Sequence, residues 1–240
     1  MWSNAWFLVK QDYKRFVLGI IVSILLVLYF SGFSSFLARE ILAGGGERPL
    51  WIASFLIDIL FLSSMSTFGF IFNGEYGKYW ITDVFTKKLL FMRMLPIDLR
   101  ELLLARYIGF FINIIFFSAL FFSTFYVLTG FSQHYTFGQF MSFLLLWISY
   151  GICSGAVYIY KELGSSGKSY LIYSFVSVGV LIALSGATSS FGYGFFATSL
   201  RLAERFPLPS AIIGLLFAAL WAIWWGRRTE RKIRMREFAR

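Results

Sequence analysis

The chain has 240 residues, of which 58% are hydrophobic and 21% aromatic, and its mean hydropathy of +0.72 exceeds what a soluble core of this length requires. Its 22 Lys and Arg outnumber the 12 Asp and Glu, which gives a formal net charge of +10. The single cysteine, Cys153, excludes a disulfide within the chain, and the single histidine, His134, belongs to no cluster of metal ligands, so enzyme chemistry has little support.

The amino-terminal residues predict an amphipathic helix. Trp2, Trp6, Val9, Tyr13 and Phe16 recur at spacings of four and three, which places them on one helical face. Indole rings prefer the headgroup level of a bilayer. We therefore expect this helix to lie in the cytoplasmic interface of the membrane.

Six apolar stretches suit a bilayer core of about 30 Å, which needs roughly 20 apolar residues per helix. They cover residues 16–36, 51–72, 107–129, 139–160, 170–188 and 209–226. All four prolines lie at the ends of these stretches or between them, as unbroken helices require. The sequence therefore predicts an all-α membrane protein, with residues 1–240 forming one domain of six transmembrane helices.

The basic residues predict an orientation. If the amino terminus is cytoplasmic, 18 of the 22 Lys and Arg fall on the inner side. The positive-inside rule then places both termini in the cytoplasm, which an even number of spans satisfies. We expect a multi-pass protein of the cell membrane whose charge attracts anionic lipid headgroups, rather than a partner of nucleic acid.

The segment at residues 73–107 is longer than a turn between neighbouring helices requires. Apolar residues recur at helical spacing over residues 84–95, with lysine and arginine between them. Pro96 cannot continue that helix, and Asp98 is well placed to cap the next one, with Glu101 three residues on. We expect a helix, a bend that projects into the cytoplasm, and a second helix that rises into the bilayer.

The sequence LPIDLRELLLARYIG, which begins at Leu95, resembles the cytoplasmic loop between the second and third spans of the small permeases of type-2 ABC exporters. The number of spans, the cytoplasmic termini and the amino-terminal helix are similar along essentially the whole chain. In that family the loop carries a coupling helix that inserts into a groove on a separate ATPase subunit. The resemblance implies a permease that pairs with a second copy or a paralogue and leaves ATP binding to the ATPase subunit.

The resemblance also implies which residues couple to the ATPase. Carried over one by one, these positions are Arg93, Leu95, Pro96, Ile97, Asp98 and Arg100. A peptide, a lipid or an amphipathic small molecule would be the cargo. The alternatives are an ATP-independent secondary transporter or channel, and a non-transporting membrane scaffold or immunity-type protein.

One apparent nucleotide motif is dismissed. The stretch ELGSSGKS ends like a phosphate-binding loop, but Glu162 stands where that motif requires glycine. The stretch also joins two predicted membrane helices and follows no predicted strand. We interpret it as a flexible Gly/Ser turn in which Lys168 lies at the membrane face.

Polar residues within the predicted spans are candidates for function. Asp58 is the ionisable residue farthest from a span end, so it is predicted to line a pathway or a subunit interface, or else to hydrogen-bond hydroxyls of a neighbouring helix. Asn113 is a weaker candidate of the same kind. Gly151 and Gly155 predict close helix packing, within the subunit or between two subunits. Residues 189–208 predict a short amphipathic helix that forms an outer gate or lies in the interface.

Overall fold

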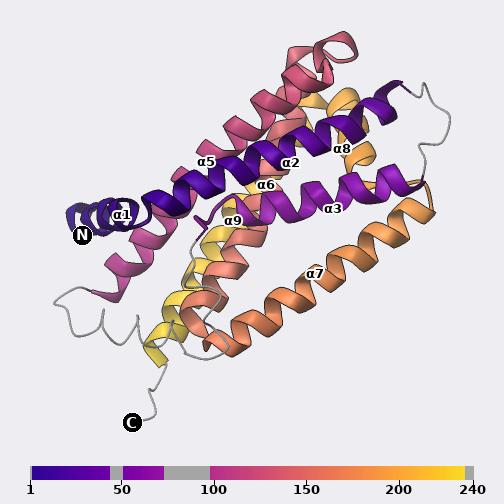
Figure 1. Ribbon diagram of the computed structural model, residues 1–240. Helices are drawn as coiled ribbons and strands as arrows, with labels where there is room; N and C mark the ends of the chain where they lie inside the picture. The colour runs from indigo at the N-terminus through magenta and orange to yellow at the C-terminus, as the bar shows by residue number, and fades with distance from the viewer. Residues whose placement is uncertain (1, 44–50, 73–97, 236–240) are drawn as a thin grey trace.

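Figure 1 shows the computed structural model of the chain, which describes residues 2–43, 51–72 and 98–235. All regular secondary structure in these residues is helical. The helices are α1 (Trp2–Arg15), α2 (Val17–Ala43), α3 (Trp51–Thr67), α5 (Leu99–Thr129), α6 (Phe137–Gly164), α7 (Gly167–Ser190), α8 (Phe195–Arg205) and α9 (Pro207–Met235), with a short 3-10 helix at Phe131–Gln133.

Five helices of 24 to 31 residues, α2, α5, α6, α7 and α9, are long and apolar enough to cross a membrane. Helix α3 is also apolar but has 17 residues. At 1.5 Å per residue it spans about 25 Å, less than the roughly 30 Å of a bilayer core. The chain thus has the predicted architecture of a helical multi-pass membrane protein, with five long candidate spans and a shorter sixth helix.

The predicted helix limits need correction at several points. The span expected at 51–72 is too long, because α3 ends at Thr67. The chain then turns through Gly69, where an added Cβ would lie 1.9 Å from the ring of Phe110. As predicted, a helix begins just after Asp98 and continues into the third span, since α5 starts at Leu99; α9 continues to Met235, beyond the predicted span end at 226. These added turns are rich in Arg, Glu and Lys, which favour helix.

Helices α3 and α6 are the inner helices of the bundle, since α2, α6, α7 and α8 pack against α3, whereas α3, α5, α7, α8 and α9 pack against α6. Helix α2 also packs along α5, and α6 along α9 (Figure 1). Helix α7 lies at the edge, where it contacts chiefly α3. An inner helix shielded by its neighbours can carry polar residues, because their partners lie within the protein.

The core consists largely of aromatic rings. Phe61 of α3 is fully buried and contacts six other rings, from α5, α6 and α8: Phe121, Phe122, Phe125, Phe143, Trp147 and Phe196. Most of these pairs are edge-on or tilted, which is the geometry that aromatic quadrupoles favour. Such interlocked packing resists small displacements.

Gly151 and Gly155 allow α6 to approach α3 and α5 closely inside the subunit. A Cβ on Gly151 would lie 2.9 Å from the carbonyl oxygen of Met65 in α3, and a Cβ on Gly155 would lie 2.1 Å from the ring of Phe110 in α5. The close packing predicted for this glycine pair is confirmed, and its place is the contact of α6 with α3 and α5. Small residues serve this purpose widely in membrane helices.

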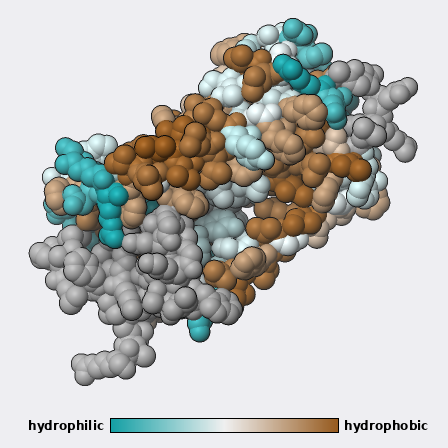
Figure 2. Space-filling model, in the orientation of Figure 1, coloured by the Kyte–Doolittle hydropathy of each residue, from teal (hydrophilic) through white to brown (hydrophobic). Residues whose placement is uncertain are grey.

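The amino-terminal helix is confirmed as α1, which packs on the first turns of α5. Ala5 and Val9 are buried there against Ala105, whereas Trp2 and Trp6 are 68% and 55% exposed. The exposed indoles suit the predicted headgroup position, which stays a prediction. Figure 2 shows hydrophilic groups at the two ends of the molecule and apolar side chains along its middle.

The two ends of the bundle differ in charge. We call the end that holds α1, the start of α5, the end of α6, the start of α7 and the end of α9 the basic end. The Lys and Arg of these described segments are Lys10, Lys14, Arg15, Arg100, Arg106, Lys161, Lys168, Arg227, Arg228, Arg231, Lys232 and Arg234. The far end, with α8, has Arg39, Arg201 and Arg205. The fold therefore gathers at one end the positive charge on which the predicted orientation depends.

Candidate functional site

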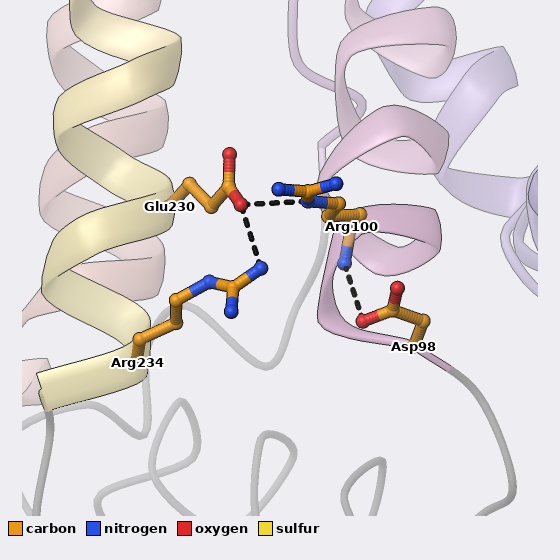
Figure 3. Close-up of polar contacts among 4 residues, drawn as sticks. All are labelled: Asp98, Arg100, Glu230 and Arg234. Carbon is orange, nitrogen blue, oxygen red and sulfur yellow. Dashed lines mark hydrogen bonds and ion pairs between the residues drawn. The ribbon is translucent and has the colours of Figure 1, made fainter.

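The start of α5 is the part of the predicted coupling region that the structure describes. Asp98 is the N-cap: its carboxylate accepts a hydrogen bond of 3.4 Å from the backbone N–H of Arg100 (Figure 3). The predicted cap is therefore confirmed. Arg93, Leu95, Pro96 and Ile97 lie outside the described residues, so their predicted role stays a prediction.

The side chain of Arg100 reaches across to α9. Its Nε atom donates to Oε1 of Glu230 at 2.8 Å, and Arg234 donates to the same oxygen at 2.8 Å (Figure 3). The Arg100 side chain is 57% exposed. Exposed ion pairs contribute little to stability because water and salt screen them. This ion pair therefore links α5 to α9, and Arg100 can exchange Glu230 for another partner.

Two more contacts tie the first turns of α5 to other helices. Asn4 of α1 donates to both carboxylate oxygens of Glu101, at 3.2 and 3.3 Å. Arg106 donates to Oε2 of Glu162 in α6 from Nη2 at 2.6 Å and from Nε at 3.0 Å, and its guanidinium also lies over the ring of Phe70. The start of α5 thus makes polar contacts with α1, α6 and α9.

Asp58 acts at the far end of the molecule, where α8 lies. It is fully buried on α3, and its two carboxylate oxygens accept hydrogen bonds from the backbone N–H groups of Phe195 and Phe196, at 2.8 and 2.7 Å. These are the first two residues of α8, whose own N-cap, Gly194, provides no side chain. Asp58 therefore caps α8 from another helix and offsets the partial positive charge of its N-terminus.

The surroundings of Asp58 explain why Gly194 precedes α8. A Cβ on Gly194 would lie 2.6 Å from Oγ of Ser54 and 3.1 Å from a carboxylate oxygen of Asp58. One turn further along α8, Ser199 accepts a hydrogen bond from the indole of Trp147. The helix predicted within residues 189–208 is confirmed, and the structure docks it in the aromatic core. Its use as an outer gate and a pathway role for Asp58 stay predictions.

Asn113 joins three segments near the basic end. It is buried on α5, its amide donates to the carbonyl of Gly69 at 3.3 Å, and its oxygen accepts from the hydroxyl of Tyr13 in α1. Burial raises the pKa of the Tyr13 phenol, which therefore stays a neutral donor. Asn113 thus holds the turn after α3 and the end of α1 against α5, and its predicted place in a pathway stays untested.

A cavity of about 530 Å³ lies between α2, α3, α6 and α7, towards the basic end. Its described lining is mostly apolar and aromatic, and it includes Phe30, Phe117 and Phe175 together with Ser23, Ser66 and Ser174. Asp58 is not among the residues that line it. The sequence pattern does not mark this cavity, because α7 is apolar around its circumference and so has no single apolar face.

The ELGSSGKS stretch is a short connection. Glu162 and Gly164 end α6, Ser166 caps α7 by accepting from the backbone N–H of Ser169, and α7 begins at Gly167. The predicted connection between two helices is confirmed but is shorter than expected, because only Ser165 and Ser166 lie outside the helices. Glu162 is engaged with Arg106. In residues 2–43, 51–72 and 98–235, no group of three His, Cys, Asp or Glu residues is placed to hold a metal ion.

Comparison with known proteins leaves the family open. No protein-family model matches the chain, and neither the curated proteins nor the solved structures contain a significant match. The resemblance to type-2 ABC exporter permeases therefore rests on the sequence features of this chain alone.

Proposed function

We propose that this chain is the membrane-spanning subunit of a type-2 ABC exporter. It moves a peptide, a lipid or an amphipathic small molecule across the cell membrane, with both termini in the cytoplasm. A separate ATPase subunit hydrolyses the ATP, and two permease chains, identical or paralogous, form the transport unit.

The observation that supports this proposal best is the set of contacts at the start of α5. The predicted coupling positions extend to Asp98, the cap of α5, and Arg100. The first turns of α5 contact α9 through Arg100, α1 through Glu101 and α6 through Arg106. A displacement of the segment would therefore reach four helices at once. Rigid-body coupling to a partner requires a connection of this kind.

A partner is also needed as a source of energy. The chain carries no complete nucleotide-binding motif, and the one partial motif forms a helix connection in which Glu162 pairs with Arg106. Asp58 is held by two backbone N–H groups rather than by a second titratable side chain. A proton relay requires several titratable groups in succession, so the contacts of Asp58 favour an ATP-driven permease over a proton-coupled transporter.

The direct test is recovery of an ATPase with the purified permease. Leu95→Asp combined with Ile97→Asp should abolish its copurification, because a charged tip cannot enter an apolar groove. The matched control is Ser3→Asp with Gln11→Asp, which adds the same charge at exposed positions of α1. Mass spectrometry should find an ATPase with Walker motifs in the wild-type and control preparations, and should not find it with the Leu95→Asp, Ile97→Asp variant. Equal recovery from all three proteins, or from none, would remove the coupling assignment.

A further inference from the structure

The cavity between α2 and α7 has walls whose polar groups are already engaged. Ser23 accepts a hydrogen bond of 2.9 Å from the backbone N–H of Phe72. Ser66 and Ser174 donate to carbonyls one turn earlier in their own helices, at 2.7 and 3.0 Å, and the hydroxyl of Tyr158 pairs with that of Ser177. The cavity therefore presents hydrocarbon and aromatic surface, which suits an apolar occupant better than a sugar or a polar peptide.

The size and position of the cavity suit a chain from the bilayer. Its volume of about 530 Å³ falls within the range of small-molecule sites, roughly 300–1,000 Å³. Phe175 and Val178 line it from α7 and are themselves 71% and 47% exposed. Because α7 lies at the edge of the bundle, its exposed apolar side chains face lipid, so the cavity borders the acyl chains of the membrane.

The charge near the cavity favours a lipid with an anionic headgroup. Lys168 is exposed in the first turn of α7, and Tyr170 and Leu171, which line the cavity, follow it directly. Lys161 lies at the end of α6 with its ammonium over the ring of Tyr173. The nearby carboxylate of Glu162 is neutralised by Arg106. A phosphate at this level meets net positive charge.

We infer that this cavity holds an acyl chain of an anionic phospholipid from the surrounding bilayer, with its phosphate beside Lys168. The lipid is a bound component that fills the space between α2 and α7. The inference does not depend on the proposed transport function, since it concerns retained lipid rather than cargo.

The test measures lipid retained by the purified full-length chain. Delipidated protein is mixed with detergent micelles that contain phosphatidylglycerol or phosphatidylcholine, and native mass spectrometry counts bound lipids. Ser174→Trp places an indole in the cavity and should lower phosphatidylglycerol retention about tenfold or more, because it displaces the buried methylenes. Val176→Trp is the matched control, since Val176 is 57% exposed and does not line the cavity.

A second variant tests the headgroup. Lys168→Gln should lower phosphatidylglycerol retention about fivefold, as expected for one basic residue at a membrane surface, and should lower phosphatidylcholine retention less, because the choline of that lipid offsets the charge of its phosphate. Equal retention by Ser174→Trp and Val176→Trp would overturn the inference, and so would wild-type protein that binds neither lipid. Equal binding of the two lipids by the wild-type protein would overturn the inferred preference for an anionic headgroup. No ATPase enters the readout, so failure here leaves the proposed function standing.

Discussion

The two ends of this bundle are stabilised by different chemistry. At the far end, a buried carboxylate caps α8 from α3, and aromatic rings interlock around Phe61. At the basic end, α5 meets its neighbours through charged side chains, among them the exposed Arg100 and the partly buried Arg106. Close aromatic packing has few alternatives, whereas exposed ion pairs exchange partners at small cost. We therefore expect the basic end to move more readily than the far end.

The largest expected effect comes from removing the cap of α8. Asp58→Ala leaves the backbone N–H groups of Phe195 and Phe196 without partners, which should cost roughly 2–6 kcal/mol of stability, at about 1–3 kcal/mol for each group. Asp58→Asn keeps one acceptor oxygen and should lose about half as much. Thermal unfolding in detergent measures both. Three equal melting temperatures would show that the far end is not held by this carboxylate.

A smaller loss is expected from overpacking α6. Gly155→Ala drives a methyl group into the ring of Phe110 and should cost about 1–3 kcal/mol. Gly179→Ala is the control on α7, where an added Cβ meets nothing within 4 Å. It should be neutral or should stabilise by up to about 1 kcal/mol, because alanine favours helix over glycine. If the two substitutions shift the melting temperature equally, the close packing of α6 on α5 is wrong.

The smallest effect on stability is expected at the basic end. Arg100→Gln leaves Glu230 with Arg234 as its ionic partner, and because the Arg100 side chain is 57% exposed, the melting temperature should change very little. Arg100→Gln combined with Glu230→Gln should change it no more. ATPase stimulation should fall more than stability does. A loss of stability as large as that of Asp58→Ala would erase the distinction between the two ends.

Local signals in the sequence predicted local features. Asp98 reads as a cap because a cap and its acceptors lie within a few residues, and the helix at α8 follows from its amphipathic spacing. The close packing at Gly151 was predicted in the same way, although its partner helices were not. The end of α3 at Thr67 was missed, because α3 gives way to a turn through Gly69, which makes room for the ring of Phe110 on another helix.

The candidate sites depend on contacts that the sequence does not reveal. Asp58 stood out as an ionisable residue, but its partners lie 137 and 138 residues further along the chain. The ion pair between Arg106 and Glu162 joins two separate helices, and the cavity exists because α2 and α7 flank α3 without filling the space between them. Such features follow from tertiary packing, which the spacing of residues within one helix does not report.

The two ends should differ in mobility: we expect the basic end to move more than the far end when the proposed ATPase partner acts. Spin-label distances test it directly in the permease–ATPase complex, with Cys153→Ser as background. One pair, Gln11→Cys and Arg231→Cys, reports on α1 and α9 at the basic end, and the other, Ser132→Cys and Arg201→Cys, reports on the far end; all four positions are exposed. Trapping the complex with ATP and vanadate should shift the first distance distribution more than the second. A shift confined to the far-end pair would contradict the account.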